Sequence, residues 1–257
     1  MKSFSFFTPK GGCGKTTLTI LLACYLAYHL HRKVIVLDLE APTHRIKAFR
    51  DKDLGLVSSG NNSLSNYLRD RQTLEPFEIE CLGKAINTYK SQDIKDVATR
   101  VNSIVGSDNF DFMLIDFPAG YSQMTVMSTL IYNGLLDYVY VPTSLEMQER
   151  MEAYNIGRVF LAENQSFRLL WNRLPASFAK YPDIFAAAEK QMADYGMNFA
   201  TTRVRSFNKA TKESDVKCFI RNTLCWPDRY VEMYCPELKN LFREIADDLG
   251  LPEKSSY

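Results

Sequence analysis

The sequence predicts an α/β fold, with a mostly parallel twisted sheet flanked by helices on both faces. Short, continuously apolar runs such as 33–39 and 112–116 have the length and composition of strands that are buried on both sides. Longer segments with apolar residues at helical spacing alternate with these runs along the chain. A glycine-rich turn at 10–17 lies between the first expected strand and the first expected helix, which is a common feature of such folds.

The individual elements follow from the same patterns. We expect strands at 3–8, 33–39, 77–81, 112–116, 138–141 and 167–171. We expect helices from the glycine-rich turn to about residue 30 and at 64–70, 93–105, 123–132, 145–163, 176–195 and 237–249. Residues 41–62 and 201–228 have little periodicity. Because we find no repeat, low-complexity tract or linker, we expect one domain spanning residues 1–257.

The composition excludes several classes of protein. With 46% hydrophobic and 24% charged residues, the chain is typical of a globular domain, and its net charge of +1 creates no general attraction to nucleic acid or membrane. The six cysteines contain no CxxC pair and the three histidines lack metal-site spacing, so we expect reduced thiols and a cytoplasmic location. No signal peptide is visible, and the longest apolar stretch, 18–30, is too short to span a bilayer.

The most informative segment reads KGGCGKTT from Lys10 to Thr17. Its glycines let successive N–H groups point at an anion, and the following helix adds a favourable dipole. Lys15 can reach the β- and γ-phosphates of a nucleotide, and the Thr16 hydroxyl can bind Mg²⁺. A chance glycine-rich turn is the alternative, but it does not explain the flanking strand and helix. We therefore expect the nucleotide to be bound by Gly11, Gly12, Cys13, Gly14, Lys15, Thr16 and Thr17.

This loop departs from the common phosphate-binding pattern, because Pro9 replaces a glycine and Lys10 adds a second lysine. The arrangement resembles the deviant Walker A motif of the ParA/MinD family of dimerising ATPases. The resemblance implies a P-loop NTPase fold, ATP and Mg²⁺ as cofactors, and a homodimer with ATP sandwiched between protomers. Lys10 would reach the partner's nucleotide and act with Lys15 in catalysis. A solvated lysine in the loop is the alternative interpretation of Lys10.

Acidic residues follow two of the expected strands. The segment DFPAG, which begins at Asp116, is similar to the Walker B and switch II region of the family. The resemblance assigns Asp116 to Mg²⁺ through water, the Gly120 N–H to the γ-phosphate, and Asp38 to support of the metal site. It assigns Glu40 to orientation of the hydrolytic water. Since the family usually has aspartate there, and since the longer side chain displaces the carboxylate, we expect slow hydrolysis.

Asn172 follows the last expected strand. The resemblance implies that an asparagine in this place reads the adenine edge. A turn-forming role is the alternative.

The candidate cargo is DNA. The resemblance implies a role in partition or maintenance of a plasmid, chromosome or mobile element, together with a ParB-like or other adaptor protein. The segment 201–221 could supply phosphate contacts, although a solvated basic face is the alternative. The DNA-binding candidates are Arg203, Arg205, Lys209, Lys212, Lys217 and Arg221.

Other members of the family suggest different roles. A MinD-like, nucleotide-gated module that recruits a protein partner and hydrolyses little ATP stays open because of Glu40. We expect no membrane binding, since the acidic, proline-interrupted ending 247–257 lacks a basic amphipathic character. Redox or metal delivery would need a cysteine pair that the sequence lacks, and a tyrosine kinase role has only Tyr257 in its favour.

Overall fold

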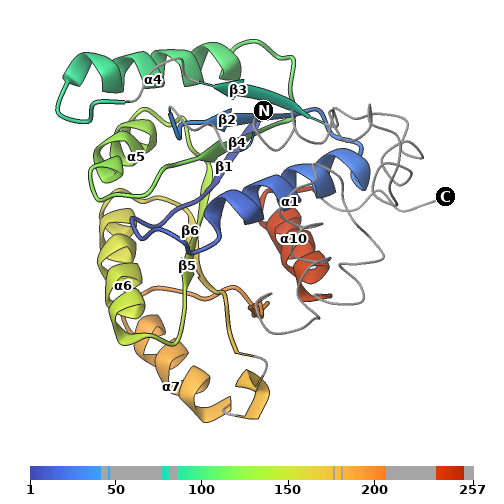
Figure 1. Ribbon diagram of the computed structural model, residues 1–257, viewed down its shortest axis with the longest axis vertical. Helices are drawn as coiled ribbons and strands as arrows, with labels where there is room; N and C mark the ends of the chain where they lie inside the picture. Colours follow the sequence, from blue (N-terminus) through green and yellow to red (C-terminus); the bar gives the residue numbers. More distant parts are fainter. Residues whose placement is uncertain are drawn as a thin grey trace, which may run out of the picture.

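The computed structural model describes residues 1–41, 46, 77–81, 86–175, 177–180, 182–206 and 236–251. In this part of the chain six strands form one all-parallel sheet in the order β3-β2-β4-β1-β5-β6 (Figure 1). The strands are β1 (Lys2–Phe6), β2 (Val34–Asp38), β3 (Glu78–Cys81), β4 (Phe112–Asp116), β5 (Tyr138–Thr143) and β6 (Phe167–Trp171). The helices are α1 (Lys15–Tyr28), α4 (Ser91–Val105), α5 (Gln123–Tyr132), α6 (Met147–Ala162), the 3₁₀ turn η1 (Phe178–Lys180), α7 (Pro182–Ala193) and α10 (Glu237–Asp248).

Helices cover both faces of the sheet, with α1 and α10 on one face and α4, α5 and α6 on the other (Figure 1). The strands supply both cores because successive side chains point to opposite faces. In β4, Phe112 and Leu114 pack with α1 and α10, whereas Met113 and Ile115 pack with the opposite layer. Burial on both sides explains why the strand reads as a continuous apolar run.

Strand pairing brings the candidate site together. In parallel pairing β2 lies beside β4, with Asp38 in register with Asp116 at their carboxyl ends. On the other side of β4 lies β1, whose carboxyl end leads into the 10–17 loop. Ligands of open parallel sheets bind outside these ends, so the topology itself brings the loop and the two acids to one edge.

The predicted fold class is confirmed, and the described elements lie close to their predicted bounds. The expected helix at 176–195 is split, because α7 begins at Pro182, a residue suited to the first helical position. The expected helix at 64–70 lies outside the described residues. Among the described residues, no helix is both long and apolar enough to cross a bilayer.

Candidate nucleotide-binding site

The loop between β1 and α1 wraps around a cavity of about 410 Å³. Gly12 and Gly14 have φ values of 73° and 84°, in the left-handed region where glycine avoids side-chain strain. Gly14 caps the N-terminus of α1, so the helix dipole points into this region. An anion therefore finds a suitable environment here. The cavity is lined by Gly11, Gly12, Cys13, Gly14, Lys15, Thr16, Thr17, Glu40, Phe117 and Ala119.

Lys15 is buried and folds back over the loop. Its ammonium group donates a hydrogen bond to the carbonyl oxygen of Lys10 at 2.9 Å. The side chain is thus held at the loop. An incoming phosphate can take the place of the neutral carbonyl as hydrogen-bond acceptor, and its negative charge makes the new bond stronger.

Asp116 is fully buried at the end of β4. Its Oδ2 accepts a hydrogen bond from the Thr16 hydroxyl at 2.8 Å, while its Oδ1 has no hydrogen-bond partner among the described residues. Burial raises the pKa of Asp116 to about 7, against the opposing effect of the Thr16 hydrogen bond, because the carboxylate loses its hydration. A buried carboxylate oxygen beside a hydroxyl is a suitable donor set for Mg²⁺.

Asp38 lies next to Asp116 but is held by backbone. Its Oδ1 accepts from the Glu40 N–H at 2.9 Å and its Oδ2 from the Ile46 N–H at 3.2 Å. These two hydrogen bonds fix the backbone that follows β2. Glu40, which lies in this segment, lines the cavity. Within the described ranges, no group of three or more His, Cys, Asp or Glu side chains is placed to hold a metal ion.

The DFPAG segment contacts the phosphate loop directly. The Gly120 N–H donates to the Pro9 carbonyl at 2.8 Å, and Gly120 has a φ of 128°. A contact between this N–H and a γ-phosphate would therefore replace a bond within the protein. The role of Gly120 stays a prediction.

Asn172 braces the loop from the end of β6. Its side-chain amide donates to the Cys13 carbonyl at 2.8 Å, and its backbone N–H donates to Thr143. A Cβ at Gly14 would lie 3.2 Å from the Asn172 amide nitrogen, so the contact also depends on glycine. Sequence reasoning missed this brace, and adenine recognition by Asn172 stays a prediction.

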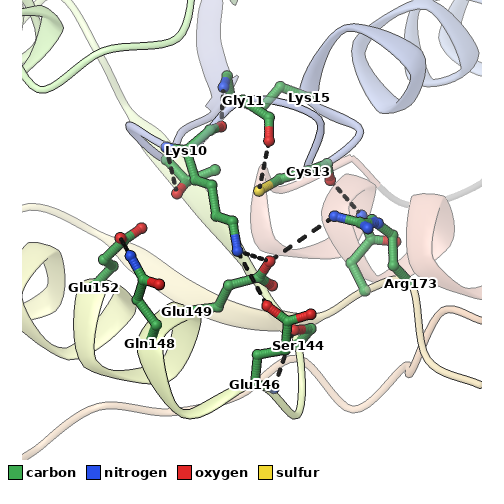
Figure 2. A network of polar contacts seen from close by, with 12 residues as sticks. Lys10, Gly11, Cys13, Lys15, Ser144, Glu146, Gln148, Glu149, Glu152 and Arg173 are labelled. Carbon is green, nitrogen blue, oxygen red and sulfur yellow. Dashed lines mark hydrogen bonds and ion pairs between the residues drawn. The ribbon is translucent and has the colours of Figure 1, made fainter.

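Lys10 lies against α6 of its own chain (Figure 2). Its Nζ is 2.6 Å from Glu149 Oε1 and 3.2 Å from Glu146 Oε2, and the Glu149 hydrogen bond is the main reason that the pKa of Lys10 is raised. Arg173 approaches the same Glu149 oxygen at 3.9 Å. Sequence reasoning missed both glutamates because they lie more than 130 residues from Lys10 and belong to no recognised motif.

The two described DNA-binding candidates are engaged in ion pairs. The Arg203 guanidinium lies 2.8 Å from Glu189 and 4.7 Å from the Phe185 ring centroid. Arg205 pairs with Glu237 at 2.7 Å. The other four candidates, Lys209, Lys212, Lys217 and Arg221, lie outside the described residues.

A phosphate loop after the first strand of a parallel sheet, with buried acids at neighbouring strand ends, defines a P-loop nucleotide-binding domain. Residues 4–109 match the family model of the CobQ/CobB/MinD/ParA nucleotide binding domain. This part of the chain includes the phosphate loop, and the match agrees with the resemblance seen in the loop sequence.

Comparison with known proteins gives distant relatives. The chain is 28% identical over 131 residues to the virulence plasmid ParA family protein pGP5-D of Chlamydia psittaci; the match covers 46% of the chain and 49% of that relative, about half its length. The MinD cell division protein of Aquifex aeolicus matches at 18% identity over 99% of this chain and 100% of its own, with a TM-score of 0.62. An McdA–ATP complex from Cyanothece matches at 17% identity over 100% and 99%, with a TM-score of 0.64. A plasmid partition protein of Borrelia burgdorferi matches at 13% identity over 95% and 98%, with a TM-score of 0.56.

Proposed function

We propose that this protein is an ATP-dependent dimerising switch ATPase of the ParA type, acting in partition or maintenance of a plasmid, chromosome or mobile element. The observation that carries the proposal is the meeting of the two-lysine phosphate loop with Asp116 at one edge of the sheet. The match of residues 4–109 to a nucleotide binding domain model supports ATP as the nucleotide. The names of the Chlamydia and Borrelia relatives support a role on plasmids.

The residues divide the chemistry among them. The loop N–H groups and Lys15 bind the β- and γ-phosphates, and the Thr16 hydroxyl with Asp116 would hold Mg²⁺, Asp116 through water. When bound there, Mg²⁺ would help to neutralise the charge that develops on the phosphates during transfer. Glu40, which lines the cavity, orients the attacking water, and its extra methylene relative to aspartate makes turnover slow.

Dimerisation would complete the site. Lys10 lies at the start of the loop, and in the dimer its ammonium would stabilise the phosphates of the partner's nucleotide. ATP would thus be required for the dimer, and its hydrolysis would release the two protomers. An adaptor of the ParB kind would set the timing of that release.

DNA would be bound without sequence preference by the basic segment 201–221. Since Arg203 and Arg205 are paired with glutamates, we expect each to contribute less than an unpaired arginine. A dimer doubles the number of phosphate contacts, so DNA affinity should depend on ATP.

A second candidate is a MinD-like recruitment module that positions a protein partner and seldom hydrolyses ATP. Glu40 in place of the usual aspartate favours it. A MinC:MinD complex of Aquifex aeolicus, whose MinD-type fold this chain shares at 18% identity with a TM-score of 0.63, gives a structural precedent.

Gel filtration with light scattering tests the proposal, using wild type, Lys10→Ala and Lys15→Ala with and without ATP, together with DNA binding across a salt series. We expect an ATP-dependent dimer that both substitutions abolish. A wild-type monomer under every condition would contradict the dimerising switch. DNA binding that ignores ATP and the substitutions Arg203→Ala and Arg205→Ala would remove the partition role and favour the recruitment module.

A further inference from the structure

The ammonium group of Lys10 is held within its own chain by two carboxylates of the α6 segment (Figure 2). Glu149 Oε1 lies at 2.6 Å and Glu146 Oε2 at 3.2 Å, so both contacts are charge-assisted hydrogen bonds. The two glutamates differ in exposure: the Glu149 side chain is 6% exposed, whereas that of Glu146 is 69% exposed. Glu149 is therefore the stronger of the two partners.

Glu149 is a buried charge that depends on its partners. Burial alone would raise the pKa of Glu149, but the hydrogen bonds from Lys10 and Ser144 outweigh it and lower the pKa. If Lys10 left without replacement, a carboxylate would stay buried with less compensation, which is costly.

Arg173 can supply the replacement. Its guanidinium is 3.9 Å from Glu149 Oε1, beyond hydrogen-bond distance but close enough to move into contact. Arg173 directly follows Asn172, whose amide is bonded to the Cys13 carbonyl of the phosphate loop. Arg173 therefore lies beside the phosphate loop, where it can replace Lys10 as the cationic partner of Glu149.

We propose that Glu149 and Glu146 form a clasp that retains Lys10 in its own protomer and opposes dimerisation, and that Arg173 takes over Glu149 when Lys10 moves to the partner's nucleotide. This inference rests on the proposed ATP-dependent dimer and adds its regulation. One ammonium group cannot bind the clasp and a second protomer's phosphates together, so the two states compete. The clasp raises the ATP concentration at which the dimer forms and keeps the nucleotide-poor protein monomeric.

The test measures the ATP concentration at half-maximal dimer formation by light scattering, with thermal melting to check folding. Glu149→Gln should lower this concentration on the order of tenfold, as expected for loss of a strong charged hydrogen bond. Glu146→Gln, at an exposed position, should lower it about two- to threefold. Arg173→Ala should raise it severalfold, because Glu149 then loses its reserve partner. Glu163→Gln, exposed at the end of α6, is the matched control and should leave it unchanged.

The outcomes separate the clasp from the proposed function. A wild-type protein that never dimerises with ATP would contradict the proposed function itself. If the wild type dimerises and Lys10→Ala abolishes the dimer, the proposed function stands. The clasp is then overturned if neither glutamine variant lowers the ATP concentration needed for dimer formation, or if Glu149→Gln raises it. Should Glu149→Gln fail to fold, Glu146→Gln and Arg173→Ala decide the question by the same criterion.

Discussion

Gly14→Ala should lower the free energy of unfolding more than an alanine at another glycine of positive φ, because the new side chain also disturbs the phosphate loop. Gly14 has a φ of 84°, where an alanine costs about 1–2 kcal/mol. The new Cβ would lie 3.2 Å from the Asn172 amide nitrogen, which must shift away from its 2.8 Å hydrogen bond to the Cys13 carbonyl. Weakening that buried bond adds about 1 kcal/mol. We therefore expect a loss of about 2–3 kcal/mol in the free energy of unfolding.

Urea unfolding measures this loss, and Gly134→Ala is the matched control. Gly134 has a φ of 64°, and a Cβ there would meet no atom within 4 Å, so only the backbone cost of about 1–2 kcal/mol applies. The difference between the two variants isolates the contact with Asn172. In an Asn172→Ala background the difference should disappear. Equal losses for Gly14→Ala and Gly134→Ala would refute the brace between Asn172 and the loop.

Three further predictions concern the acids. Glu40→Ala should lower steady-state ATP hydrolysis about tenfold, and Glu40→Asp should raise it, because the shorter side chain corrects the position of the carboxylate; a rate that ignores both changes excludes Glu40 as the water-orienting group. Asp116→Asn should abolish the extra thermal stability that Mg²⁺ adds to the nucleotide-bound protein, measured as the melting temperature with and without Mg²⁺; an increment equal to that of wild type would exclude Asp116 from the metal site. Asp137 accepts hydrogen bonds from the Ser3 N–H, the Ser3 hydroxyl and Lys2. These bonds outweigh the effect of burial and lower the pKa of Asp137. The ionised Asp137 therefore stabilises the fold fully above the ordinary aspartate pKa, and this stabilisation is lost as the pH falls through the lowered pKa of the folded state. Asp137→Asn should therefore lower the melting temperature at pH 7 by a few degrees and have less effect at acid pH; an equal effect at both values would contradict the ionic contribution.

The sequence predicts the parts of the fold that local pattern controls. Continuous apolar runs mark the strands because both faces of the sheet are buried. The phosphate loop is recognisable because its glycines and Lys15 act within eight consecutive residues. Asp38 and Asp116 could be placed near the loop, since strand ends of a parallel sheet share one edge.

Contacts between distant segments could not be predicted in this way. The Asn172 amide donates a hydrogen bond to the Cys13 carbonyl, which is 159 residues away in the sequence. The family resemblance led instead to the expectation that Asn172 contacts adenine. Lys10 meets Glu149 across 139 residues, on a helix whose sequence gives no sign of the contact. Arg203 is part of a basic run in the sequence, but tertiary packing brings Glu189 against it.

The function proposed for this protein requires that the 10–17 loop binds ATP. Calorimetric titration of Mg-ATP into wild type, Lys15→Ala and the exposed control Lys95→Ala measures this binding. We expect saturable binding of one ATP per chain in wild type and Lys95→Ala, with affinity reduced at least tenfold in Lys15→Ala, because a charged phosphate contact is lost. If the wild type does not bind ATP, or if Lys15→Ala binds it equally well, the 10–17 loop is not the ATP site.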